Sequence, residues 1–237
     1  MAPLSAYWQQ ISLSSWVIGL SIVGFVVGRA VYQRSGGSPF LHPLLVGTPL
    51  VAGILYLVSI DFDTYYLGNG ALNWLLGPTT VALAVPLAKQ MRQLPPLLLT
   101  VATTVLIGGF FATGCALAMA LMFDADQLIV LSLAAKSVTT PIAVGITEQL
   151  GGLVTLIVMV VLLTGIAGIL TAQTIFNYTK ITDERWQGLI LGISAHAIGT
   201  ARAFEKSPRC GAFSTLGMGL NGIWTSIFLP PLMAFLL

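Results

Sequence analysis

The chain has 237 residues, of which 56% are hydrophobic and only 8% carry a charge. Soluble domains carry roughly 25% charged residues, so this composition excludes a soluble enzyme and a disordered linker. The formal net charge of +2 is too small to attract nucleic acid, so no nucleic-acid partner is expected. The lipid bilayer is the expected environment, and the predicted fold class is an all-α polytopic membrane protein.

Long uncharged stretches mark the expected membrane segments. Six stretches exceed the roughly 20 residues that a helix needs to cross a bilayer. They are residues 1–28, 35–60, 64–88, 93–123, 149–179 and 210–237. Two shorter segments, 127–147 and 186–204, contain polar residues, so each either crosses as a broken helix or turns back. The sequence therefore predicts about eight membrane segments in one domain over residues 1–237, with six to eight full crossings.

Charges in the first loops alternate in sign and predict the orientation. In chain order the loops carry Arg29 and Arg34, Asp61 and Asp63, Lys89 and Arg92, and Asp124 and Asp126. Because cytoplasmic loops are enriched in Lys and Arg, the N-terminus is expected outside the cytoplasmic membrane.

Two segments of the chain resemble each other. Residues 79–90 read TTVALAVPLAKQ and residues 139–149 read TTPIAVGITEQ, each with a Thr pair, a proline and a charge. Self-similar segments interrupted by proline are typical of transporters with broken helices at their centre. Chance similarity between short apolar segments is the alternative.

The second segment contains the most unusual charge. Lys136 follows Asp126 by ten residues, which at about 1.5 Å per residue places it near the middle of a membrane about 30 Å thick. Charged residues at this depth usually serve a function. Pro141 has no amide hydrogen, so it leaves the carbonyl of Ser137 without a helical partner. Pairing of Lys136 with Glu148 is the structural alternative.

The residues around Lys136 predict a site for a small carboxylate. Thr139 and Thr140 supply hydroxyl groups beside the expected break, and the helix that begins there points its positive end inward. In the first segment, Thr79 and Thr80 offer the same hydroxyls without a charge. Expected structural breaks are Pro78, Pro86 and Pro141, with simple kinks as the alternative for the first two.

A third polar group lies in residues 186–204. His196 is again about 15 Å deep, and Thr200 lies one turn later on the same helical face. Arg202 is a candidate carboxylate clamp, and His196 or Glu205 is a candidate for proton coupling. The alternative is an ion pair between Arg202 and Glu205 that closes the helix end. No metal site is expected, because the other histidine, His42, is distant in the sequence.

The last segment carries a single amide, Asn221, among the glycines of residues 217–222. Asn221 is a candidate substrate-binding residue, and close helix packing at the glycines is the alternative.

Four motifs in order resemble the LrgB/CidB family of bacterial membrane proteins. They are GPTTVALAVPLAKQ (77–90), KSVTTPIA (136–143), AHAIGTARAFE (195–205) and GAFSTLGMGLNG (211–222). Thr79 and Ala88 depart from the residues expected there, without affecting a proposed role. The resemblance implies a location in the bacterial cytoplasmic (inner) membrane. It implies two activities: antiholin-like control of murein hydrolases with a holin-like LrgA/CidA-type partner, or transport of pyruvate, glycolate or glycerate.

The buried charges favour the transporter over the lysis regulator, because a protein that only docks a partner has no need of Lys136 in the membrane. Alternating access around a central site is the expected mechanism, and a homodimer is the expected assembly. A membrane enzyme is not expected, because no nucleophile, metal set or carboxylate pair shares one depth. No cofactor is expected.

Overall fold

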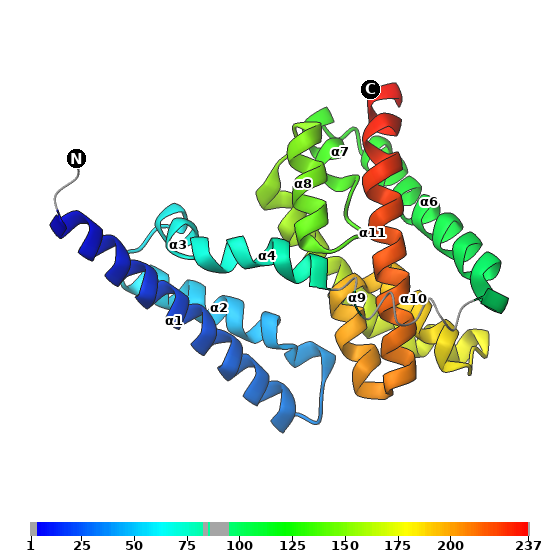
Figure 1. Cartoon of the computed structure of the whole chain (residues 1–237), viewed down its shortest axis with the longest axis horizontal. Helices are drawn as coiled ribbons and strands as arrows, with labels where there is room; N and C mark the ends of the chain where they lie inside the picture. Colours follow the sequence, from blue (N-terminus) through cyan, green and yellow to red (C-terminus); the bar gives the residue numbers. More distant parts are fainter. Residues whose placement is uncertain (1–3, 83–84, 86–94, 237) are drawn as a thin grey trace. The chain divides into compact units, whose positions relative to one another are not determined.

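The protein is all-helical in the computed structural model, which describes residues 4–82, 85 and 95–236 (Figure 1). The predicted fold class is therefore confirmed. By its internal contacts the chain divides into two compact units, Met1–Thr79 and Thr80–Leu237. That one domain covers residues 1–237 stays a prediction.

The first unit is built from closely packed helices. Its described elements are α1 (Leu4–Arg34), η1 (Pro39–Leu41), α2 (Pro43–Leu57), α3 (Phe62–Gly68) and α4 (Gly70–Ala82), which continues past the unit's end. Glycines let the backbones of α1 and α2 touch, since a Cβ added to Gly28 would lie 2.3 Å from the carbonyl oxygen of Pro43. Helices α2 and α3 meet at a bend of 115°.

A hydrogen-bonded cluster joins α1 to α3 in this unit. The hydroxyl oxygens of Ser21 and Tyr65 lie 2.7 Å apart, and Ser21 also donates to the side-chain oxygen of Asn69 at 3.0 Å. Polar groups in an apolar interior need such partners, so this cluster fixes how the two helices pack.

The second unit contains the segments that the sequence marks as broken. Its described elements are η2 (Pro95–Leu97), α6 (Leu98–Met122), α7 (Gln127–Leu133), α8 (Thr140–Leu150), α9 (Val154–Thr179), α10 (Glu184–Lys206) and α11 (Pro208–Leu236).

Local sequence explains where these helices begin and end. Pro141 occupies the first turn of α8, where its missing N–H is not needed, and Gly151 ends α8 with a positive φ of 77°. Asp183 caps α10 by accepting from the backbone N–H of Arg185 at 2.9 Å. Hydrogen bonds from the Arg185 side chain lower the pKa of Asp183 from 3.8 to about 2.

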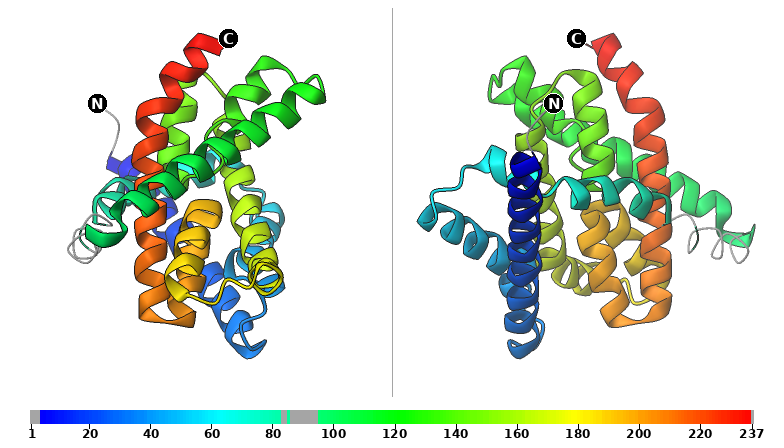
Figure 2. Two further views of the ribbon diagram at one scale, coloured as in Figure 1. Left: turned by 90° about the vertical axis from the view of Figure 1, so that its right-hand side faces the viewer. Right: turned by 60° about the vertical axis from the view of Figure 1, so that its left-hand side comes forward.

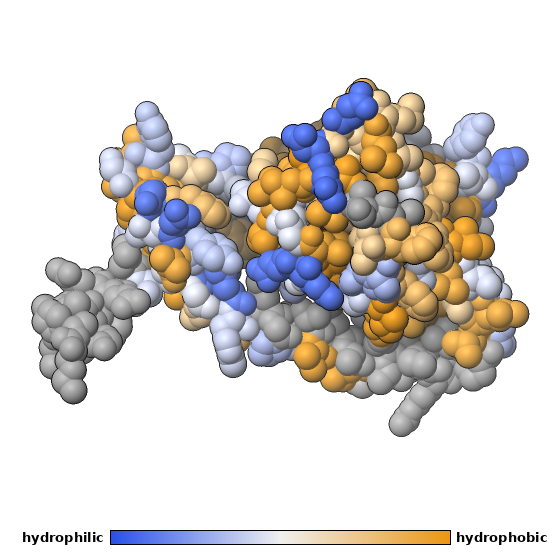
Figure 3. Space-filling view, turned by 90° about the horizontal axis from the view of Figure 1, so that it is seen from above, coloured by the Kyte–Doolittle hydropathy of each residue, from blue (hydrophilic) through white to orange (hydrophobic). Residues whose placement is uncertain are grey.

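Four described helices are long and apolar enough to cross a membrane, and the bent pair α2–α3 makes up to five. The four are Ser14–Arg34, Leu98–Met122, Val154–Thr179 and Pro208–Phe235. In the space-filling view, apolar side chains cover much of the visible surface (Figure 3). A multi-pass membrane protein is therefore confirmed, whereas the finer count of six to eight crossings stays a prediction.

The segment α7–α8 turns back to the side from which it starts. The backbone N–H of Leu153, just after α8, donates to the hydroxyl of Ser132 in α7 at 2.6 Å. In one straight helix these two residues would lie about 30 Å apart. The chain must therefore reverse between them, which it does at residues 134–139, where no helix forms.

The segment α10 also turns back, although it is helical at almost every residue. Its last turn meets its first: the hydroxyl of Ser207 donates to Glu184 at 2.6 Å, and the Lys206 ammonium donates to Gln187. A straight helix would separate Ser207 from Glu184 by about 34 Å. The bend lies at His196, with φ 41° and ψ −127°. Both ambiguous segments of the sequence therefore turn back on themselves within the second unit, and we refer to them as the re-entrant segments.

The two re-entrant segments pack at opposite ends of the three long helices (Figures 1 and 2). Segment α7–α8 shares a buried apolar cluster with the C-terminal ends of α6 and α11 and the N-terminal half of α9. Segment α10 shares two clusters with the N-terminal parts of α6 and α11 and the C-terminal end of α9. Their turns point toward the middle of the unit.

Candidate functional site

The turn of the first re-entrant segment, residues 134–139, is held by Asn221 of α11. The side-chain amide nitrogen of Asn221 donates to the carbonyl oxygen of Ser137 at 2.9 Å. The sequence predicts that Pro141 leaves this carbonyl without a helical partner, and the structure shows which residue replaces that partner. Asn221 is 1% exposed and Ser137 4% exposed, so the contact is buried.

Lys136 lies in the same turn and is half-buried. Its ammonium is 3.4 Å from the hydroxyl of Ser137. Neighbouring residues of the same turn pack against Val161 of α9, whose carbonyl oxygen lies 3.0 Å from Nε2 of His196. Within the part of the chain that the structure describes, Lys136 forms no ion pair with an acidic residue, Glu148 included. The charge is therefore available to an anion.

The N-terminus of α8 adds hydroxyl groups beside Lys136. Thr139 is the N-cap residue but makes no capping hydrogen bond, and its buried hydroxyl has no partner among the described residues. Thr140 begins the helix and is half-buried. A helix N-terminus carries partial positive charge, so this end of α8 complements the negative charge of a carboxylate.

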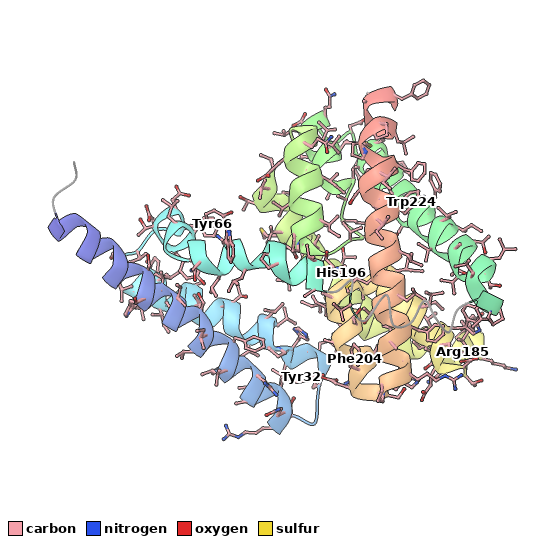
Figure 4. The ribbon with its side chains drawn as sticks, in the orientation of Figure 1. Tyr32, Tyr66, Arg185, His196, Phe204 and Trp224 are labelled. Atoms are coloured by element: carbon pink, nitrogen blue, oxygen red, sulfur yellow. The ribbon has the colours of Figure 1, made fainter. Side chains whose placement is uncertain are left out.

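His196 fixes the turn of the second re-entrant segment. Its Nε2 lies 3.0 Å from the carbonyl oxygen of Val161 in α9, and because a carbonyl only accepts, Nε2 carries the proton. Figure 4 shows His196 near the middle of the second unit. The ring is 2% exposed and packs against α9 at Gly165, where an added Cβ would come within 2.8 Å of Cε1.

Thr200 extends this hydrogen-bonded group to α11. Its hydroxyl donates to the carbonyl oxygen of His196 at 2.8 Å and lies 2.9 Å from the hydroxyl of Ser214. Sequence reasoning missed Ser214 and Val161. Gly192 was the available sequence signal for Ser214, because a glycine allows close contact between helices. At Gly192 the backbones of α10 and α11 touch, and an added Cβ would lie 2.1 Å from the Ser214 carbonyl oxygen.

Arg202 and Glu205 form an ion pair near the end of α10. The guanidinium and the carboxylate are 2.7 Å apart, and both side chains are more than 40% exposed. This geometry favours the account in which the pair closes the helix end. The roles of Arg202 as a clamp and of Glu205 in proton coupling stay predictions.

Most of the first sequence segment, residues 79–90, lies outside the described residues. Pro78 lies within α4 and is exposed. The backbones of Thr79 and Thr80 belong to α4, but their side chains are outside the described residues, as is all of Pro86. Their roles stay predictions. Among described residues, no group of three His, Cys, Asp or Glu side chains could hold a metal ion.

Comparison with known proteins identifies the family. Residues 21–235 match the LrgB-like family. The chain is 33% identical over 217 residues to the uncharacterized protein YwbG of Bacillus subtilis, covering 92% of this chain and 96% of that relative. It is 26% identical over 216 residues to the holin-like protein CidB of Staphylococcus aureus, covering 91% and 94%. No solved structure matches the chain significantly. The resemblance drawn from the four motifs is confirmed.

Proposed function

Because the chain belongs to the LrgB-like family of membrane proteins, we propose that it carries small monocarboxylates, of the pyruvate, glycolate or glycerate type, across the bacterial inner membrane. Transport by alternating access needs a central site that opens to each side in turn. The observation that carries the proposal is that two turns, one from each end of the second unit, both contact Val161 of α9, and that the first of them holds Lys136.

Lys136 and the start of α8 form the proposed carboxylate site. The ammonium supplies the charge, while Thr139, Thr140 and Ser137 supply hydroxyl groups. Hydrogen bonds that involve a charged group contribute about 1.5 to 3 kcal/mol each, enough to hold a small anion in a partly buried site. His196 and Thr200 form the opposite turn, and proton coupling through His196 remains part of the proposal.

The charges at the two ends of the second unit support an orientation. One end carries Asp124, Asp126 and Glu148, and the other carries five basic residues, Lys180, Arg185, Arg202, Lys206 and Arg209, together with Asp183, Glu184 and Glu205. Because Lys and Arg favour the cytoplasm, we place the α9–α10 and α10–α11 turns inside and the α6–α7 turn outside. This agrees with an N-terminus outside, which the first loops predict.

A second function rests on the name of a relative, the holin-like protein CidB. In that account the chain is an antiholin-like regulator of murein hydrolase activity, acting with a holin-like LrgA/CidA-type partner. A homodimer is proposed for either function. Neither function requires an enzyme reaction or a cofactor. The regulator needs only surfaces that pack against its partner, so loss of Lys136 would leave its activity intact.

The test is uptake of radiolabelled pyruvate, glycolate and glycerate into liposomes that contain the purified protein, with and without a holin-like partner. We expect saturable uptake that falls at least about tenfold in Lys136→Ala, because one charge-assisted contact is lost. Lys136→Arg keeps the charge and is expected to retain part of the uptake. Arg202→Ala is expected to fall less than tenfold, because Arg202 is already paired with Glu205.

Folding of each variant is checked by its elution as a single species in detergent and by its thermal midpoint. If folded wild-type protein moves none of the three acids, even with the partner present, the carrier proposal is wrong and the regulator takes its place.

A further inference from the structure

A cavity of about 270 Å³ lies within the first unit, between α1, α2 and α3. Helices α1 and α2 run side by side along it (Figure 1). Its lining is mainly apolar, with Phe25 from α1, Leu44, Val51 and Leu55 from α2, and Phe62 from α3. Phe25 is 49% exposed and Phe62 60% exposed, so the cavity is open along one side. We call it the α1–α2 groove.

The end of the groove at α3 is closed by polar groups that already have partners. The hydroxyl oxygens of Ser21 and Tyr65, both in the lining, lie 2.7 Å apart, and Ser21 lies 3.0 Å from the side-chain oxygen of Asn69. Because these groups are hydrogen-bonded to one another, this end of the groove favours an apolar group over a polar solute.

The other end of the groove carries a positive charge. Ser21, Phe25 and Arg29 follow one another at intervals of four residues, so they lie on one face of α1. Arg29 is exposed and lies one turn beyond Phe25. Its neighbour Gly28 touches the start of α2, since an added Cβ there would lie 2.3 Å from the carbonyl oxygen of Pro43. Arg29 therefore lies at the end of the groove where α2 begins.

The length of the groove matches one leaflet of a membrane. Leu44 and Leu55, both in the lining, are eleven residues apart in α2, which corresponds to about 16 Å. This is about half of a hydrocarbon core about 30 Å thick, the depth that the acyl chains of one leaflet fill. Arg29 carries the first charged side chain of the sequence, so it belongs at the level of the headgroups. The predicted orientation places this end at the cytoplasmic leaflet, whose surface is negative.

We propose that the α1–α2 groove binds one acyl chain of an anionic phospholipid, with Arg29 holding the phosphate group. An apolar groove with a guanidinium at its headgroup end complements both parts of such a lipid. An apolar helix of a second copy would fill the groove but would leave Arg29 without an anion. The inference does not depend on the carrier function, because the groove lies in the first unit and contains none of the residues of the proposed carboxylate site.

The test measures lipid binding to the delipidated full-length protein in detergent. Phosphatidylglycerol and phosphatidylcholine with identical acyl chains are titrated separately, and native mass spectrometry gives the affinity of the first lipid bound. We expect phosphatidylglycerol to bind about fivefold more tightly, because one arginine near an anionic headgroup contributes about that factor. Arg29→Gln is expected to abolish this preference. Ala52→Phe adds a benzyl group in the groove and is expected to weaken both lipids about fivefold or more.

Two variants are matched controls. Arg34→Gln removes the same charge from the same helix, but Arg34 lies nine residues after Phe25 and therefore on the opposite face of α1. Gly53→Phe adds a benzyl group one residue after Ala52, where an added Cβ would meet nothing within 4 Å. We expect both controls to bind the two lipids as wild type does.

Cross-linking locates the lipid in the wild-type protein, so it does not depend on the folding of a variant. A phosphatidylglycerol with a photoreactive group in the middle of one acyl chain is added at less than one molecule per protein. We expect labelling within residues 21–25 or 44–55 that excess unlabelled phosphatidylglycerol prevents. Labelling confined to other residues would overturn the proposal.

Three results of the binding assay would also overturn it. Equal affinity for the two lipids, or equal effects of Arg29→Gln and Arg34→Gln, would mean that Arg29 does not hold the headgroup. If glycerol 1-phosphate at equal concentration displaces phosphatidylglycerol, the site recognises a free phosphate and the groove has no part in it. If Ala52→Phe leaves lipid binding unchanged but dissociates a homodimer, the groove is an interface between two copies of the chain.

Discussion

The two re-entrant segments of the second unit reverse the chain in different ways. Segment α7–α8 gives up helical structure over residues 134–139 and is held from outside by Asn221. Segment α10 is helical on both sides of a single non-helical residue, His196. The side chain of His196 itself holds the bend against α9.

The two segments also differ in whether their buried polar groups have hydrogen-bond partners. In α10 the buried Gln187, His196 and Thr200 all have partners. In the first segment Ser132 has partners, but the buried hydroxyl of Thr139 has none among the described residues, and neither has the side-chain oxygen of Asn221 in α11, which holds the turn. A ligand can supply partners for buried polar groups that the protein leaves without one, whereas groups that already have partners hold the fold together. The first turn is therefore the better candidate for binding, and the second for support of the fold.

The largest predicted effect is a difference in chemical labelling between the two ends of the second unit. Glu148→Cys and Arg209→Cys place thiols at the ends of the two segments, in a background with Cys115→Ser and Cys210→Ala. A membrane-impermeant maleimide should label Glu148→Cys in intact cells and Arg209→Cys only after permeabilisation, an all-or-none difference. Lys180→Cys should behave like Arg209→Cys. Equal labelling of Glu148→Cys and Arg209→Cys in intact cells would show that the segments do not enter from opposite sides.

The next effect compares a glycine from each segment. A Cβ at Gly192 in α10 would lie 2.1 Å from the carbonyl oxygen of Ser214, whereas one at Gly145 in α8 would meet nothing within 4 Å. We expect Gly192→Ala to lose about 1 to 3 kcal/mol of stability or more, because backbones would have to separate. Gly145→Ala should be neutral or gain up to about 1 kcal/mol. Thermal unfolding in detergent measures both, and similar losses in the two variants would contradict the packing described for α10.

The smallest effect concerns the bend at His196. Both His196→Ala and His196→Gly lose the hydrogen bond to Val161, but only glycine adopts a positive φ without strain. We expect His196→Gly to be the more stable by about 1 kcal/mol.

Ser194, an exposed and regularly helical residue two positions earlier, is the control for the bend. There the order should reverse, because glycine weakens an ordinary helix by about 1 kcal/mol relative to alanine. The same order at both positions would mean that His196 is not held in a strained conformation in the membrane.

Much of the site could be predicted from sequence because membranes restrict what a backbone can do. Pro141 and Lys136 predict a break and a charge close together; in the structure Lys136 lies in the turn 134–139 and Pro141 in the first turn of α8, directly after it. His196 was singled out by its depth and polarity, and it lies at the bend of α10. In each case the sequence contains a group that is unfavourable in a membrane helix, either a missing backbone N–H or a polar side chain, and neighbouring residues are enough to identify it.

Other features depend on contacts between distant residues. The sequence left open whether residues 127–147 and 186–204 cross or turn back, because length and charge favoured different answers. Ser132 with Leu153, and Glu184 with Ser207, decide in favour of turning back. Similarly, the sequence allows two roles for Arg202, an ion pair with Glu205 or a clamp for the substrate. The distance of 2.7 Å between the guanidinium and the Glu205 carboxylate favours the ion pair.

The sequence by itself determined the membrane environment, the helical class, the family and the positions along the chain where helices are interrupted, because these follow from composition, spacing and ordered motifs. Only the tertiary structure decided which polar groups are satisfied. Asn221 illustrates the difference, since nothing near it in sequence shows that its NH₂ group is bound to Ser137, 84 residues away, while its oxygen has no described donor. A hydrogen bond depends on the distance and direction of two groups, and in this protein packing across helices sets both.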